Sequence, residues 1–102
     1  MKQRKARSSG TPIQGTLPCR ISRGIFSSER GVRVTLPTGR EVCTIVDKEH
    51  VHPDQDVPPG QEIEGRVNVR VVELREDSAL VDLPQPAVMQ GTRIEIPRTM
   101  LE

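Results

Sequence analysis

Apolar residues alternate with polar residues through most of this 102-residue chain, a pattern typical of β-strands. Leu17, Cys19 and Ile21 fall on one face of a first strand, which we expect to run to about Phe26. A turn rich in Ser, Glu and Arg follows this strand. The chain therefore begins its folded part with a strand that has one buried face.

The clearest hairpin lies in the next segment. Val32, Val34 and Leu36 alternate with polar residues, and a Pro-Thr-Gly-Arg turn ending at Arg40 follows them. Residues 41–46 form the return strand. Apolar residues occupy both faces of this return strand, which predicts that neighbouring elements cover it on both sides.

A long loop and a long strand are expected next. Residues 47–60 carry four acids, two histidines and three prolines, so we expect a loop with at most one helical turn. In the strand that follows, four apolar residues are expected to face inward: Ile63, Val67, Val69 and Val71. Val72 and Leu74 continue the apolar series one residue out of step, which predicts a β-bulge.

The C-terminal part predicts two more strands. Residues 79–83 pair back after a turn, and prolines at 84 and 86 end that strand. Residues 93–96 form a short last strand that is too polar to be central. We expect no helix of three turns and no internal repeat, and we base nothing on residues 101–102.

These elements predict an all-β fold in a single domain. Five main strands connected by hairpins, with one longer interruption, favour a closed five-stranded Greek-key barrel over residues 17–100, with the last strand as an addition. A partly open SH3-like barrel is the alternative. Residues 1–16 are basic and almost without apolar side chains, so we expect a disordered tail.

Composition narrows the possibilities further. The chain is 33% hydrophobic with one aromatic residue, Phe26, so Val, Ile and Leu must form the core. No stretch approaches the roughly 20 apolar residues that span a bilayer, and the chain does not begin with a secretory signal, so we expect a cytoplasmic protein with no membrane partner. Cys19 and Cys43 are interpreted as small buried residues, and a disulfide bond between them is the alternative.

The net charge of +1 hides an asymmetry along the chain. Residues 1–40 hold nine Lys or Arg and one acid, whereas residues 41–102 hold six Lys or Arg and thirteen acids. A positive surface could therefore face an anionic partner. Four of the nine cations fall in the expected tail, so the charge could equally belong to a solvated terminus.

Three segments resemble a known family. Residues 31–42, 59–67 and 79–83 are similar to strands of OB-fold barrels of the S-one RNA-binding type and of bacterial translation initiation factor one. The likeness lies in the turn glycines and the valine alternation of a small OB-like Greek-key barrel. It implies that the outer face of the first three strands binds single-stranded RNA.

A nucleic-acid-binding module is accordingly the first functional hypothesis. With only Phe26 available for base stacking, affinity would depend on charge and would fall with salt. The expected contact residues are Arg20, Arg23, Phe26, Arg33, Arg40, Arg66 and Arg70. The alternative is that these arginines bind nothing and only form a solvated polar face, as arginines at outward strand positions commonly do.

The second hypothesis is a protein-interaction or assembly module. In that case strand 93–96 or the loop at Val88 and Met89 would meet a partner, because a sheet edge is a ready pairing surface. His50 and His52 lie among acids in an exposed loop, where we expect no metal site. Since no nucleophile–base pair or phosphate-binding loop is recognisable, we expect that the protein is not an enzyme and binds no cofactor or small-molecule substrate. We also expect a monomer.

Overall fold

The computed structural model describes residues 13–84 and 92–102, and their regular structure is β-strand apart from two short 3₁₀ turns. The strands form one antiparallel seven-stranded sheet. They are β2 (Ile13–Arg23), β3 (Glu29–Thr35), β4 (Glu41–Asp47), β5 (Val51–His52), β6 (Glu62–Leu74), β7 (Ser78–Leu83) and β8 (Thr92–Pro97). The turns are η1 (Lys48–His50) and η2 (Arg98–Met100). The all-β prediction is confirmed, whereas the predicted set of five strands is not.

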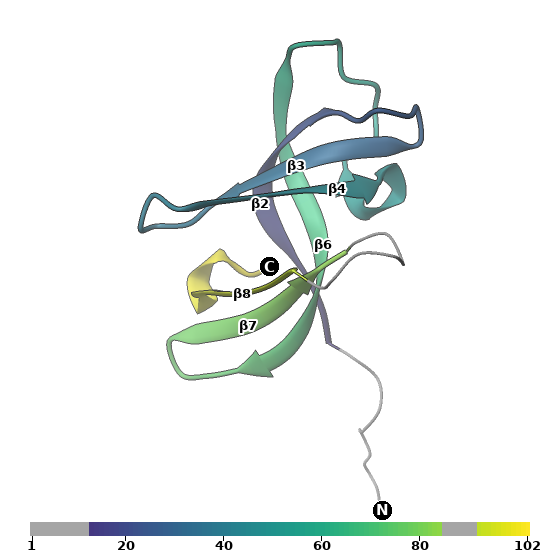
Figure 1. The fold of residues 1–102 in the computed structure, drawn as a ribbon. Helices are drawn as coiled ribbons and strands as arrows, with labels where there is room; N and C mark the ends of the chain where they lie inside the picture. Colours follow the sequence, from purple (N-terminus) through teal and green to yellow (C-terminus); the bar gives the residue numbers. More distant parts are fainter. Residues whose placement is uncertain (1–12, 85–91) are drawn as a thin grey trace, which may run out of the picture.

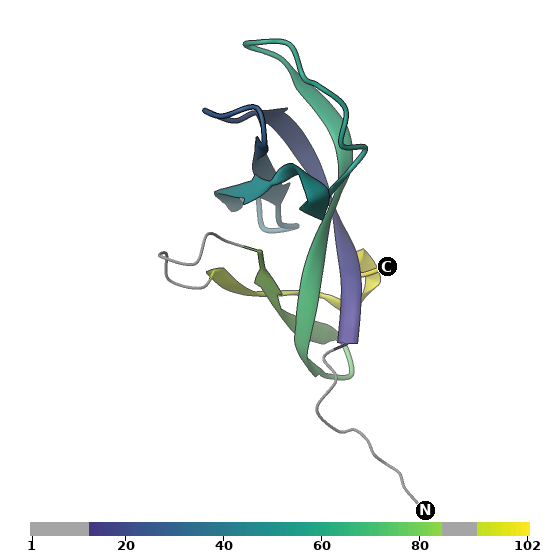
Figure 2. The same cartoon turned by 90° about the vertical axis from the view of Figure 1, so that its right-hand side faces the viewer.

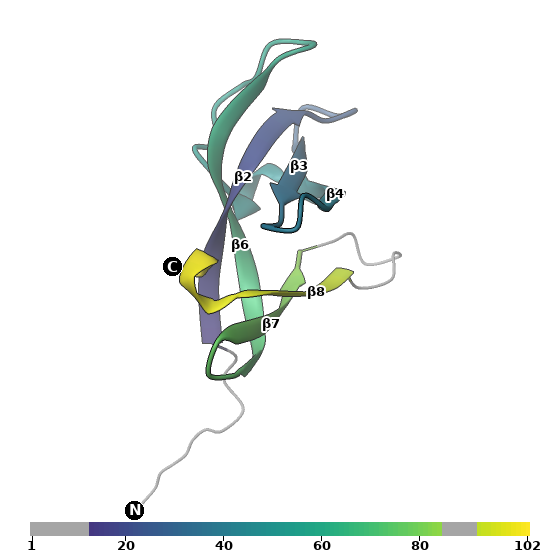
Figure 3. The ribbon, with the colours of Figure 1, turned by 90° about the vertical axis from the view of Figure 1, so that its left-hand side faces the viewer.

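The sheet is organised around its two longest strands. Its order is β4-β3-β2-β6-β7-β8, with β5 pairing beside β6. Strands β2 and β6 form a long central ribbon, which the two hairpins β3–β4 and β7–β8 cross (Figure 1). Both hairpins lie on the same side of that ribbon (Figures 2 and 3). The result is a curled sheet that encloses the core as a half-barrel.

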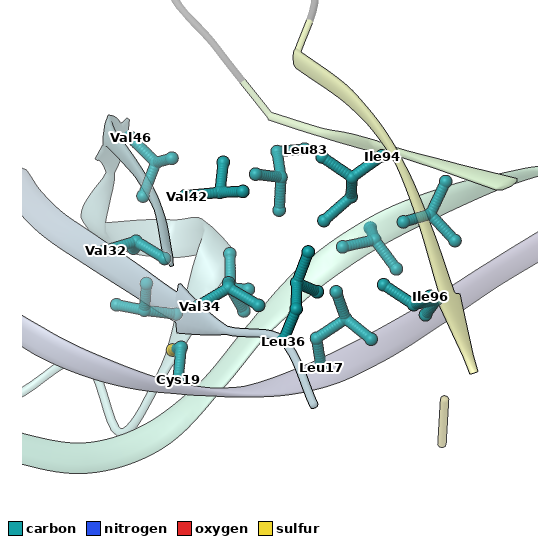
Figure 4. Close-up of a cluster of buried hydrophobic side chains, with 14 of the residues drawn as sticks. Leu17, Cys19, Val32, Val34, Leu36, Val42, Val46, Leu83, Ile94 and Ile96 are labelled. Atoms are coloured by element: carbon teal, nitrogen blue, oxygen red, sulfur yellow. The ribbon is translucent and has the colours of Figure 1, made fainter. Parts of the chain in front are cut away.

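The core fills the concave side of this sheet. The predicted inward faces of the first two strands are buried, as are Val67, Val69 and Val71 of β6, whereas Ile63 is only partly buried. Residues of both hairpins point toward one another in this cluster, among them Val42 and Leu83 (Figure 4). Each buried Val or Leu side chain contributes about 1.5–3 kcal/mol relative to exposure, so aliphatic packing supplies most of the stability.

The chain contains a structural repeat, although none was expected from the sequence. Residues 13–52 (the first half) and 63–102 (the second half) each contain a long strand, two further strands, a 3₁₀ turn and a short closing segment. The turns Lys48–His50 and Arg98–Met100 occupy matching places, fifty positions apart. The sheet order is accordingly the same read from either end, with the β2–β6 pair at its centre.

Each half closes on the long strand of the other. In the first half, Val51 and His52 pair with Val67 and Arg66 of β6. The second half closes on β2 of the first half: the Thr16 amide donates to the main-chain oxygen of Glu102 at 2.7 Å. The Glu102 amide donates back to the Thr16 carbonyl at 3.0 Å. The C-terminal dipeptide is therefore part of the fold.

Two matching glycines make room for these crossings. A Cβ on Gly65 would overlap the carbonyl oxygen of His52 and the side chain of Ile21. A Cβ on Gly15 would lie 2.8 Å from Leu101 Cδ1 and 3.2 Å from the Glu102 carbonyl. Both glycines sit in extended strands without positive φ, so close approach explains them.

Several predicted boundaries change. Residues 13–16 belong to β2 and pair with β6, contrary to the predicted disordered tail, while residues 1–12 lie outside the described part of the chain. Strand β2 ends at Arg23, which places Phe26 in the following turn. The loop after β4 contains one helical turn, in line with the prediction of at most one, and also the short strand β5, which was not predicted.

The interpretation of β4 as a strand covered on both faces is wrong. Strand β4 lies at one end of the sheet order, and Cys43 on its outer face is exposed. Cys19 is buried as expected, whereas the prediction that Cys43 is buried is wrong, and both cysteines are free. The sequence of β4 resembles a central strand, but the fold leaves its outer face open.

The predicted bulge in the long strand is confirmed. The register between β6 and β7 shifts between Val71 and Glu73. Val72 and Leu74 are each 41% exposed, so the out-of-step residues do not join the core. The last strand, β8, lies at the other end of the sheet order, as predicted.

The matching glycines allow a test of the crossings. We expect Gly65→Ala to lower the free energy of unfolding by about 2–3 kcal/mol, because the new methyl group meets a backbone carbonyl. Gly15→Ala should cost about 1 kcal/mol or less, since the flexible end of Leu101 can move aside. Urea titrations of both variants measure the difference, and equal losses would contradict this account.

Candidate functional site

The predicted nucleic-acid face is centred on Arg20 and Arg33, which lie opposite each other on β2 and β3. Their guanidinium groups are engaged by carboxylates. Arg33 Nη1 donates to Glu41 Oε2 at 2.6 Å, and its Nε and Nη2 donate to Glu62. Arg20 lies 3.7 Å from Glu62 and 3.9 Å from Glu64.

This cluster has more acids than bases. Hydrogen bonding from Arg33 lowers the pKa of Glu62, and the same bonds to Glu62 and Glu41 raise the pKa of Arg33. Two arginines and three glutamates give the cluster a net charge of −1 near neutral pH. A phosphate would have to displace carboxylates here, so the arginines are not an open cationic surface.

Arg66 and Arg70 have different surroundings. Arg66 donates to the Thr16 hydroxyl at 2.8 Å and to the Thr16 carbonyl at 3.2 Å, and it lies 3.6 Å from Glu102. It therefore supports the C-terminal crossing. Arg70 belongs to the half of β6 that pairs with β7, where it bonds Asp82 at 2.7 Å.

Arg23 and Arg40 form no ion pair with any residue in the described part of the chain. They lie near opposite ends of the seven-residue strand β3. At about 3.3 Å per residue, this strand separates them by roughly 20 Å. The seven predicted contact residues thus do not form one cluster.

Among the described residues, the most exposed large apolar side chains lie beside Arg23, in the turn between β2 and β3. Ile25 is 84% exposed and Phe26 is 66% exposed. Two hydrogen bonds close the backbone of this turn: the Glu29 amide donates to the Phe26 carbonyl at 2.9 Å, and the Phe26 amide donates to the Glu29 carboxylate at 3.3 Å. The only aromatic residue of the chain is held at the surface.

A buried arginine connects this turn to the loop after β5. Arg30 is 2% exposed and donates to the carbonyls of Ser27 and Glu29 at 2.9 and 2.7 Å. It also donates to the carbonyls of Gln55 and Asp54 and to the Asp56 carboxylate. The sequence gives no sign of this role of Arg30, because only the tertiary structure brings these carbonyls to it.

Two side chains of chemically reactive types, Cys19 and His52, are constrained by their surroundings. Burial raises the pKa of the Cys19 thiol to about 11, against a smaller opposing effect of Arg66, so the thiol is protonated at neutral pH. His52 Nε2 lies 3.0 Å from Asn68 Oδ1. Within residues 13–84 and 92–102, His, Cys, Asp and Glu side chains form no group of three that could hold a metal ion.

Comparison with known proteins adds no relative. No family model matches the chain, and no curated protein or solved structure matches it. The helical turns that the structure describes are all too short to cross a membrane. The OB-like resemblance and the cytoplasmic location therefore stay predictions, and the loop at Val88 and Met89 lies outside the described residues.

Asp82 pairs with two arginines of the second half. Its carboxylate accepts from Arg93 Nε at 2.8 Å and from Arg70 Nη2 at 2.7 Å. These hydrogen bonds, chiefly that of Arg93, outweigh partial burial and lower the pKa of Asp82 to about 2. The carboxylate is thus charged across the physiological range and joins β6, β7 and β8.

Asp82→Asn should destabilise the protein in a pH-dependent manner. The folded pKa lies below the ordinary value of 3.8, so the stabilisation is complete above about pH 4 and disappears as the pH falls through 2. At pH 7 we expect a loss of about 1–2 kcal/mol, since the pair is partly solvated. Urea unfolding of both proteins between pH 7 and pH 2 measures it; a difference that stays constant with pH would contradict the assignment.

Proposed function

We propose that this chain is a non-catalytic binding module of the cytoplasm, and that its main partner is a protein that receives the turn carrying Ile25 and Phe26. The observation that carries the proposal is the exposure of these two side chains on a turn held by Arg30. Aromatic side chains on an ordered support are typical centres of protein interfaces, because little conformational entropy is lost on binding. We call this surface the Ile25–Phe26 turn.

The charge near the turn favours a protein with a basic binding surface over a nucleic acid or an anionic membrane. Glu29 bonds the turn itself, and Asp54 and Asp56 border it through Arg30. Residues 13–102 hold eleven Lys or Arg and fourteen Asp or Glu, a net charge of −3. Residues 13–102 taken alone would repel nucleic acids and anionic membranes and attract an apolar pocket with a basic rim, whereas the four cations of residues 1–12 act in the opposite direction.

Single-stranded RNA binding is the second candidate, and one observation favours it. Arg23, which has no ion pair in the described part of the chain, lies close in sequence to the exposed Phe26 ring. A base could stack on that ring while Arg23 meets the phosphate, and the four cations of residues 1–12 would add non-specific attraction. This arrangement would also suit the OB-like barrel that the sequence resembles.

The protein hypothesis is tested with a photo-crosslinking residue placed at position 26 of the full chain, in extract of the source organism. The recovered partner is then purified and titrated against wild type, Phe26→Ala and Leu74→Ala. Leu74 is a matched control because it is exposed and apolar but lies on the second half. We expect Phe26→Ala to weaken binding by about 30-fold and Leu74→Ala by less than about twofold. Equal losses would refute the role of the turn.

The RNA hypothesis makes a different prediction for the same variant. A labelled mixed-sequence single-stranded RNA is titrated with wild type and Phe26→Ala at 20 mM and about 150 mM salt. On the protein hypothesis, any binding at low salt is lost at high salt and does not depend on Phe26. Saturable binding at high salt that Phe26→Ala removes would favour the RNA function instead.

A further inference from the structure

The outer face of β4 is apolar in its middle, and no strand or helical turn that the structure describes packs over it. Its outward residues alternate as Glu41, Cys43, Ile45 and Asp47. Cys43 is exposed and Ile45 is half-buried. Ile45 lies opposite Gly31 of β3, which has no side chain to cover it. A shallow groove of about 300 Å³ results, with Cys43 and Ile45 among its lining residues.

The second half of the chain shows that the fold does not need this apolar face. At the positions of β8 that correspond to Cys43 and Ile45 stand Arg93 and Glu95. Arg93 bonds Asp82, and Glu95 accepts from Arg75 at 2.8 Å. Charged residues thus satisfy the same place in the same architecture, so folding alone does not explain the apolar pair on β4.

The free edge of β4 has no protecting feature within the described residues. Among the described residues, β4 pairs only with β3, which leaves its other row of backbone groups without a strand partner. Natural edge strands usually carry Lys, Pro or a bulge that prevents pairing, and β4 has none of these. Its main-chain groups and its apolar side chains together suit the addition of a strand.

Charge indicates which strand would be accepted. If two copies of β4 paired antiparallel about Thr44, Glu41 of one would face Asp47 of the other, which is unfavourable. Glu41 is already paired with Arg33, yet its cluster with Arg20, Glu62 and Glu64 keeps a net charge of −1, so this end of β4 stays negative. The occupant should therefore be basic at both ends.

We propose that β4 receives an extended segment of a partner protein by strand addition, with apolar side chains over Cys43 and Ile45 and basic side chains opposite Glu41 and Asp47. The pattern is basic, apolar, apolar, basic at every second residue. This surface is separate from the Ile25–Phe26 turn and does not depend on it. The chain would then hold two partner segments, or two parts of one partner, on its first half.

The proposal is tested with a labelled synthetic peptide, Ser-Lys-Thr-Val-Thr-Val-Thr-Lys-Ser, titrated against the full chain by fluorescence anisotropy. Amide NMR shifts report the location. We expect saturable binding that shifts the amides of β4 and leaves those of β8 unchanged. The same peptide with Glu in place of both Lys should bind at least about tenfold more weakly.

Variants of β4 provide the control for the site. Ile45→Glu should weaken the peptide at least about fivefold, and it should fold because Glu95 occupies the matching place in β8. Ile45→Thr, which keeps strand propensity, is the second variant should the first fail to fold. Phe26→Ala should leave peptide binding unchanged. Absence of binding at ~1 mM peptide, equal binding of the charge-swapped peptide, or shifts confined to β8 would each overturn the proposal.

Discussion

The antiparallel pairing of β2 with β6 is the constraint on which the rest of the structure depends. Leu17 and Val67 are partners at the middle of this ribbon, and neither is exposed. One end of each long strand pairs with its own hairpin, and its other end receives the closing segment of the opposite half. Neither half can complete its sheet alone, so we infer that the two halves fold cooperatively.

Arginine does much of the work of joining these parts. Arg30 ties two loops together through carbonyl groups, and Arg66 supports the crossing of the C-terminus over β2. Arg70 and Arg93 share Asp82 across three strands. In a chain with one aromatic residue and an aliphatic core, these polar connections join strands and loops that are far apart in the sequence. Their engagement also reduces the positive surface that the chain's many arginines would otherwise present.

Comparison of the two halves separates what the architecture requires from what it does not. The glycines at 15 and 65 and the closing segments are shared, because both crossings need the space. The turn with Ile25 and Phe26 has only a charged counterpart, Arg75 to Asp77, in the second half. Cys43 and Ile45 are likewise replaced by charged residues there. Both apolar surfaces therefore belong to the first half, where we place the binding function.

Local patterning predicted the approximate positions of six strands, most of their buried faces and the bulge, since alternation of Val, Ile and Leu depends only on neighbouring residues. It did not predict β5 or the pairing of residues 13–16. Local patterning could not reveal the repeat, because few residues are identical in the two halves. Ile13, Gly15 and Arg20 of the first half match Ile63, Gly65 and Arg70 of the second. Local patterning also assigned β4 two covered faces. Whether a strand lies inside or at the end of a sheet, and whether an arginine meets a carboxylate, a carbonyl or water, depends on contacts between residues far apart in the chain. Only the tertiary structure decides these contacts, because the sheet order sets them.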